Sequence, residues 1–131
     1  MKKINIGLIG CGRVGDYYFN ILKSNKIKNF KLISVCDDNI KKTNKFKKKF
    51  KCKTFRKYNN PNFFKNLDAV LILTPSGSHF KIAKFFLKKK INVISEKPLT
   101  LLPKNSLVLN KLAQKNKVMC TVVFQNRFNK S

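Results

Sequence analysis

The hexapeptide Gly10-Cys11-Gly12-Arg13-Val14-Gly15 is the sequence feature that most constrains how this chain can fold. It follows the apolar run of residues 4–9. It precedes a segment with apolar residues at the spacing of one helix face, namely Val14, Tyr17, Tyr18, Ile21 and Leu22. A second apolar run, residues 30–35, leads to Asp37. Glycines between a strand and a helix, with an acid after the next strand, are the pattern of a dinucleotide-binding fingerprint.

Each glycine of this loop has a distinct physical role in such a fingerprint. Gly10 permits the tight turn out of the strand, Gly12 lets a pyrophosphate approach the backbone, and Gly15 allows close helix–strand packing. The free N–H groups of the first helical turn, around Arg13 and Val14, are predicted to face the phosphates at the positive end of the helix dipole. A glycine-rich turn that binds no ligand is the alternative interpretation.

The acid after the second apolar run predicts which dinucleotide binds. Asp37 is expected to accept hydrogen bonds from the adenosine ribose hydroxyls. A 2′-phosphate at that place would meet two carboxylates, Asp37 and Asp38. The sequence therefore favours NAD over NADP as the cofactor.

Length and composition favour a single domain in the cytoplasm. The chain has 131 residues, of which 43% are apolar, and no apolar stretch approaches the ~20 residues of a membrane span. No signal-peptide pattern follows Met1, so we expect neither secretion nor membrane association. The four cysteines, Cys11, Cys36, Cys52 and Cys120, show no metal-ligand spacing and are predicted to be reduced, mostly buried thiols. Since Cys11 lies in the glycine loop, we expect a thiol reagent to block that site.

The net charge of +25 raises a second class of function, nucleic-acid binding. The excess is almost entirely lysine, spread over nearly every segment, and the abundance of lysine, asparagine, isoleucine and phenylalanine indicates a bias toward A/T-rich codons. No recognition motif is present. A basic nucleic-acid-binding protein is therefore the less favoured alternative, and non-specific adhesion to polyanions at low salt is expected.

Alternating patterns predict an α/β fold of the Rossmann type, a doubly wound parallel sheet in a single domain over residues 1–124. The predicted strands are residues 3–9, 30–36, 52–55, 69–73, 92–95 and 118–124. The predicted helices are 13–25, 40–50, 78–89 and one starting at Pro103, whose inward residues are expected to be Val108, Leu109, Leu112 and Ala113. Ligands bind at the carboxyl ends of such strands. The polar residues that collect there are Asp37, the segment Thr74-Pro75-Ser76-Gly77-Ser78-His79, the segment Glu96-Lys97-Pro98, and Gln125-Asn126-Arg127.

At these motifs the chain resembles the Gfo/Idh/MocA family of NAD(P)-dependent oxidoreductases. The glycine fingerprint, the Thr74-Pro75 turn followed by His79, and Glu96-Lys97-Pro98-Leu99 match that family in order and spacing. The last motif is the most specific to the family. Gln125-Asn126-Arg127-Phe128 resembles the branch that oxidises sugar nucleotides, such as UDP-linked acetamido sugars.

The resemblance implies roles for individual residues. Lys97 would lie beside the nicotinamide and the reacting hydroxyl as a catalytic residue that moves or orients a proton, and Glu96 would bind cofactor ribose or orient Lys97. The peptide bond before Pro98 is a candidate for cis geometry. The remaining residues that could contact the cofactor are Thr74, Pro75, Ser76, His79 and Gln125, although turn formation or packing also accounts for Thr74, Ser76 and His79.

Members of that family continue into a second α/β domain, which binds substrate and builds the oligomer. Here residues 125–131 correspond to the start of that domain. The resemblance therefore implies one half of an oxidoreductase acting on a sugar or sugar-nucleotide hydroxyl by hydride transfer, completed by a C-terminal domain, a partner chain or a homo-oligomer. A non-catalytic dinucleotide-binding module, or a gene fragment that needs a partner chain, is the alternative.

Overall fold

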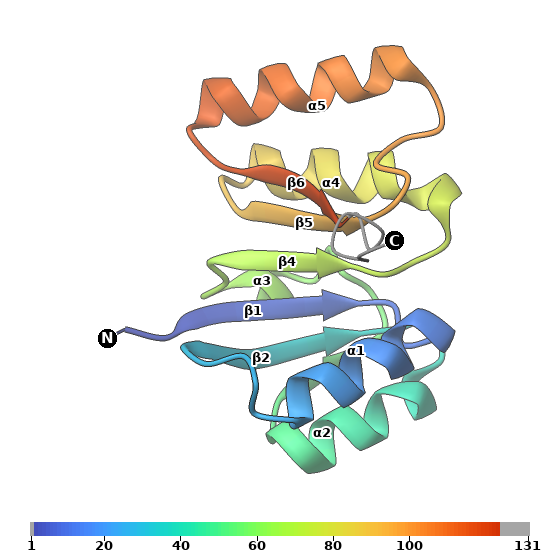
Figure 1. Ribbon diagram of the computed structural model, residues 1–131, viewed down its shortest axis with the longest axis vertical. Coiled ribbons are helices and arrows are strands. Elements are labelled where there is room, and N and C mark those ends of the chain that lie inside the picture. The colour runs from blue at the N-terminus through green and yellow to red at the C-terminus, as the bar shows by residue number, and fades with distance from the viewer. Residues whose placement is uncertain (1, 124–131) are drawn as a thin grey trace, which may run out of the picture.

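Six parallel strands form one sheet in the order β3-β2-β1-β4-β5-β6 (Figure 1). The strands are β1 (Ile4–Ile9), β2 (Phe30–Cys36), β3 (Lys53–Phe55), β4 (Ala69–Ile72), β5 (Asn92–Glu96) and β6 (Cys120–Val123). This computed structural model describes residues 2–123. The predicted fold class, a doubly wound Rossmann-type sheet, is confirmed.

Helices connect successive strands on both faces of the sheet. They are α1 (Arg13–Lys23), α2 (Asn44–Phe50), α3 (Pro61–Phe64), α4 (His79–Lys88) and α5 (Pro103–Asn116), with 3-10 turns η1 (Ile40–Thr43) and η2 (Ser76–Ser78). From β1, the strands β2 and β3 are added in turn on one side. The chain then crosses back to place β4 on the other side of β1. This reversal creates a switch point between β1 and β4, where the connections on either side diverge and leave a crevice.

Two hydrophobic cores hold the helices on the sheet. One lies under α1 and α2 and contains Leu22 and Phe46 together with Leu8 and Val35 from the sheet. The other lies under α3, α4 and α5 and is rich in aromatic rings. The strand β4 is buried along its whole length, as the continuous apolar run of its sequence predicts.

The inner faces of two helices differ from the sequence prediction. Val14 and Tyr17 were expected to point inward, but they are 40% and 54% exposed. The buried residues of α1 are Gly15 and Leu22, so the helix is rotated to bring its glycine against the sheet. On α5, Leu109 and Ala113 are buried as predicted, whereas Val108 is exposed.

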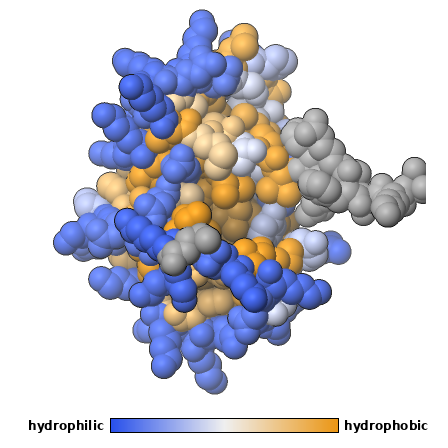
Figure 2. Space-filling model, turned by 60° about the vertical axis from the view of Figure 1, so that its left-hand side comes forward, coloured by the Kyte–Doolittle hydropathy of each residue, from blue (hydrophilic) through white to orange (hydrophobic). Residues whose placement is uncertain are grey.

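Hydrophilic residues cover much of the face shown in Figure 2, and they surround an apolar area at its centre. Within residues 2–123, a single ion pair is formed, between Lys45 and Asp16. Most of the positive charge is therefore balanced by counterions and water rather than by carboxylates. None of the helices in this part of the chain is both long and apolar enough to cross a bilayer.

The substitution Gly15→Ala is expected to lower the free energy of unfolding by about 1–2 kcal/mol. A Cβ at this position would lie 2.6 Å from the backbone oxygen of Gly10. That overlap involves backbone at the end of a central strand, so it outweighs the better helix propensity of alanine. Urea unfolding measures the difference.

Gly77→Ala is the matched control, because a Cβ there would meet no atom within 4 Å. Equal unfolding midpoints for the two variants would contradict the close packing of α1 on the sheet.

Candidate functional site

The glycine loop turns sharply at the end of β1. Gly10 has a φ of +100°, and a Cβ there would lie 2.7 Å from the carbonyl carbon of Leu73. Its N–H donates to the carbonyl of Cys36 at 2.9 Å. At Gly12, by contrast, a Cβ would meet nothing within 4 Å, so no atom of the described chain requires a glycine there.

The amino end of α1 presents backbone donors that have no partner within residues 2–123. Gly12 is the N-cap, and no side chain among the described residues caps the helix at this position. The N–H of Asp16 donates to the carbonyl of Gly12 at 2.9 Å, which is the first bond of the helix. The N–H groups before it have no helical acceptor and lie at the positive end of the helix dipole, an arrangement suited to an anion.

Asp37 links the glycine loop to the end of β2. One carboxylate oxygen accepts the N–H of Cys11 at 2.8 Å, and the other accepts the N–H of Asn39 at 2.9 Å. Each oxygen of a carboxylate has a second lone pair, so the side chain can still accept from a hydroxyl group. Asp37 therefore has a structural role and keeps free acceptor positions for the predicted contact with a ribose.

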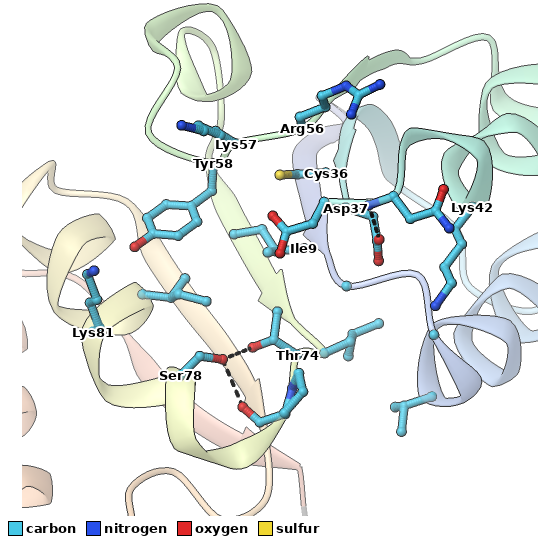
Figure 3. Close-up of a pocket in the computed structure, with 18 of the residues that line it drawn as sticks. Ile9, Cys36, Asp37, Lys42, Arg56, Lys57, Tyr58, Thr74, Ser78 and Lys81 are labelled. Carbon is cyan, nitrogen blue, oxygen red and sulfur yellow. Dashed lines mark hydrogen bonds between the residues drawn. The ribbon is translucent and has the colours of Figure 1, made fainter.

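A cavity of about 910 Å³ opens at the carboxyl ends of the strands (Figure 3). Seven of the residues predicted to bind a cofactor line it, namely Gly10, Gly12, Arg13, Val14, Asp37, Thr74 and Pro75. The other predicted residues with described positions, Gly15, Ser76, His79, Glu96 and Lys97, do not line this cavity. Gln125 lies outside the described residues.

The cavity is also lined by Ser78, Arg56 and Tyr58, which were not predicted to contact a cofactor. Ser78 Oγ lies 2.7 Å from Thr74 Oγ1 and 2.8 Å from the carbonyl oxygen of Pro75, which fixes the turn after β4 (Figure 3). Arg56 and Tyr58 follow β3, the one strand whose carboxyl end was not considered. Their position at that end is the signal that could have identified them.

Charges of both signs face the cavity. Asp37 and Asp38 lie on its wall together with Lys42, Arg56 and Lys81. The cations offer partners to phosphate groups, whereas the carboxylates offer partners to hydroxyl groups. The cavity is therefore chemically suited to a ligand that has both.

The segment after β5 is held by two side chains from different helices. Glu96 is buried, and its Oε1 accepts the hydroxyl of Tyr18 at 2.6 Å. Burial and this hydrogen bond raise the pKa of Tyr18 above its ordinary value. Lys97 is exposed, and the peptide bond between Lys97 and Pro98 is cis, as predicted.

His79 is buried at the start of α4, with both ring nitrogens facing backbone oxygens. Nδ1 lies 2.7 Å from the carbonyl oxygen of Pro98, and Nε2 lies 2.6 Å from that of Thr74. The side chain is 1% exposed. The ring thus joins the turn after β4 to the turn after β5.

The cysteines are free thiols, and three of the four are buried. Cys11 is only 3% exposed, although it lies in the glycine loop. Burial raises its pKa to about 12, with a further contribution from the nearby carboxylate of Asp37. The expectation that a thiol reagent readily blocks this loop is therefore wrong, because the side chain points into the core.

At pH 8, Cys11 is expected to react with a thiol reagent only as fast as the protein opens. With a pKa of about 12, roughly one thiol in ten thousand is a thiolate at that pH. Modification of Cys11, followed by mass spectrometry with and without urea, measures this protection. Rapid stoichiometric labelling of Cys11 in the folded protein would contradict its burial.

The sequence profile of the Gfo/Idh/MocA family, described as an oxidoreductase family with an NAD-binding Rossmann fold, matches residues 4–124. A UDP-N-acetylglucosamine 3-dehydrogenase of Acidithiobacillus ferrooxidans is 26% identical over 122 residues. That match covers 93% of this chain and 37% of the relative.

Solved structures show the same similarity. The WlbA dehydrogenase of Chromobacterium violaceum, in complex with NADH and UDP-GlcNAcA, superposes with a TM-score of 0.89 at 28% identity. The scyllo-inositol dehydrogenase of Lactobacillus casei, with bound NAD(H) and scyllo-inositol, gives 0.87 at 25% identity. Each match covers 98% of this chain, but 37% and 38% of those chains. The chain thus spans less than two fifths of the relatives that it matches.

Proposed function

The chain belongs to the Gfo/Idh/MocA oxidoreductase family, and we propose that it binds NAD in the cavity at the carboxyl ends of its strands. The observation that carries this proposal is the space at Gly12 beside the uncapped amino end of α1. The packing of the described residues does not require a glycine at this position, because a Cβ on Gly12 would contact none of them. The bare backbone at Gly12 is the surface that a pyrophosphate needs for close approach.

The residues around the cavity fit the two halves of such a cofactor. Backbone N–H groups of Arg13 and Val14 would bind the pyrophosphate, and Asp37 would accept hydrogen bonds from the adenosine ribose. Thr74 and Pro75, in the turn after β4, also line the cavity, and Thr74 adjoins the glycine loop at Gly10. The size of the cavity is within the range of ordinary cofactor pockets.

We assign the proton chemistry of the proposed reaction to Lys97. When NAD is bound, its nicotinamide ring supplies the hydride acceptor. An exposed lysine at the end of β5 can then orient a substrate hydroxyl and take part in its deprotonation. Glu96 precedes it and would orient this segment rather than contact the ribose, because its side chain is buried and does not line the cavity.

The substrate class proposed for the whole enzyme is a sugar or sugar nucleotide. Support comes from the relatives, of which one is a UDP-N-acetylglucosamine 3-dehydrogenase and another holds scyllo-inositol. Hydride transfer requires the reacting carbon to be held over the nicotinamide ring. Since the matched relatives are far longer than this chain, we propose that a further domain or a partner chain provides that contact.

NAD at about a hundred times its dissociation constant is expected to stabilise the protein by about 2.7 kcal/mol. Gly12→Ala should abolish most of this stabilisation, because its methyl group would occupy the space proposed for the pyrophosphate. NADP should stabilise less than NAD, since its 2′-phosphate would approach Asp37 and Asp38. Thermal unfolding at moderate salt, with and without nucleotide, measures these differences.

Gly77→Ala is the control, because the added methyl group also meets no atom but lies off the cavity. Asp37→Ala is a less specific variant, since it also removes the acceptor of the Cys11 N–H. If Gly12→Ala and Gly77→Ala respond equally to NAD, the proposed site is wrong.

A further inference from the structure

We infer that Tyr18 and His79 are positioning residues that clamp the Glu96-Lys97-Pro98 segment from the two faces of the sheet. Tyr18 belongs to α1, which packs on one face, and His79 belongs to α4, which packs on the other. The inference rests on the proposed role of Lys97. It assigns to the two side chains the task of holding that lysine in place.

The Tyr18 contact fixes the residue before Lys97. The phenol donates to Glu96 Oε1 over 2.6 Å, and Glu96 is 8% exposed. A buried carboxylate without a donor is costly, so this bond strongly favours one orientation of Glu96. It is the only side-chain hydrogen bond formed by the Glu96 carboxylate within the described part of the chain.

The His79 contact fixes the residue after Lys97. Its Nδ1 faces the carbonyl oxygen of Pro98, which can only accept, so this bond requires a proton on Nδ1. Nε2 of the same ring lies 2.6 Å from the carbonyl oxygen of Thr74.

Each contact also connects Lys97 to a wall of the cavity. The helix that carries Tyr18 begins at the glycine loop, and the carbonyl bound by His79 Nε2 belongs to Thr74, which lines the cavity. Lys97 itself is exposed and lies between the two fixed neighbours. A cofactor in contact with the glycine loop and Thr74 would thus meet the lysine at a fixed position.

The test compares Tyr18→Phe with Tyr17→Phe, its exposed neighbour, which makes no hydrogen bond among the described side chains. In Tyr18→Phe, the backbone order parameter of Lys97 is expected to fall from about 0.85 to below 0.6, with Tyr17→Phe unchanged. The clamp would be overturned if the order parameter of Lys97 did not change in Tyr18→Phe, or if it fell equally in both variants.

Comparing the affinities for NADH and AMP distinguishes a loss of Lys97 positioning from a general disruption of the cofactor site. Tyr18→Phe should weaken NADH binding about fivefold, the ratio that one ordinary hydrogen bond represents, while the affinity for AMP stays constant because AMP reaches only the adenosine end. Equal loss of both affinities would contradict a positioning role. If the unmodified chain binds neither ligand, the proposed function is wrong. The order parameters would still test the clamp, because they are measured without a ligand.

The second contact can be tested on the unmodified chain, because His79 is its single histidine. Labelling histidine with ¹⁵N gives one imidazole signal pair, and the clamp predicts a proton on Nδ1 that is protected from exchange with solvent. A ring nitrogen Nδ1 without a proton would overturn the bond to Pro98. This measurement does not depend on whether any variant folds.

Discussion

The contact between α1 and the turn after β1 is the constraint on which the rest of the site depends. Gly15 approaches the carbonyl of Gly10 so closely that a Cβ would lie 2.6 Å from that oxygen. This approach lets the helix begin directly after the strand, with its amino end at the switch point between β1 and β4. The bond from Cys11 to Asp37 attaches the end of β2 to the same turn. Backbone donors, a carboxylate and a cavity are thereby brought together, and no side chain of residues 2–123 caps the helix.

The net positive charge of the chain attracts anionic ligands to this site over long distances. With 30 basic and 5 acidic residues, the protein attracts any polyanion at low ionic strength. At ordinary salt, exposed charges more than about 8–10 Å apart are screened, whereas hydrogen bonds within a cavity persist. Nucleotide binding that persists at ordinary salt therefore reports recognition by the glycine loop, whereas binding seen only at low salt reports general charge attraction.

Local patterns predicted most of the fold, and contacts distant in sequence account for what was missed. The glycine loop, β2 and Asp37 were predicted because each depends on residues within one strand–helix unit. The inward face of α1 was misjudged at Val14 and Tyr17, because the apolar stripe is wide and the close approach at Gly15 decides the rotation. The bond between Tyr18 and Glu96 spans 78 residues, so no pattern along the chain could reveal it.

The most direct test of the account is a two-dimensional ¹H–¹⁵N NMR titration of the chain with NAD at moderate salt. If NAD binds at the amino end of α1, the largest amide shifts will occur at Gly12, Arg13 and Val14, with smaller ones at Asn39 and Thr74. Amides at the opposite ends of the strands, such as Asn29, should not move. Shifts spread over lysine-rich segments, with none at the glycine loop, would contradict the account.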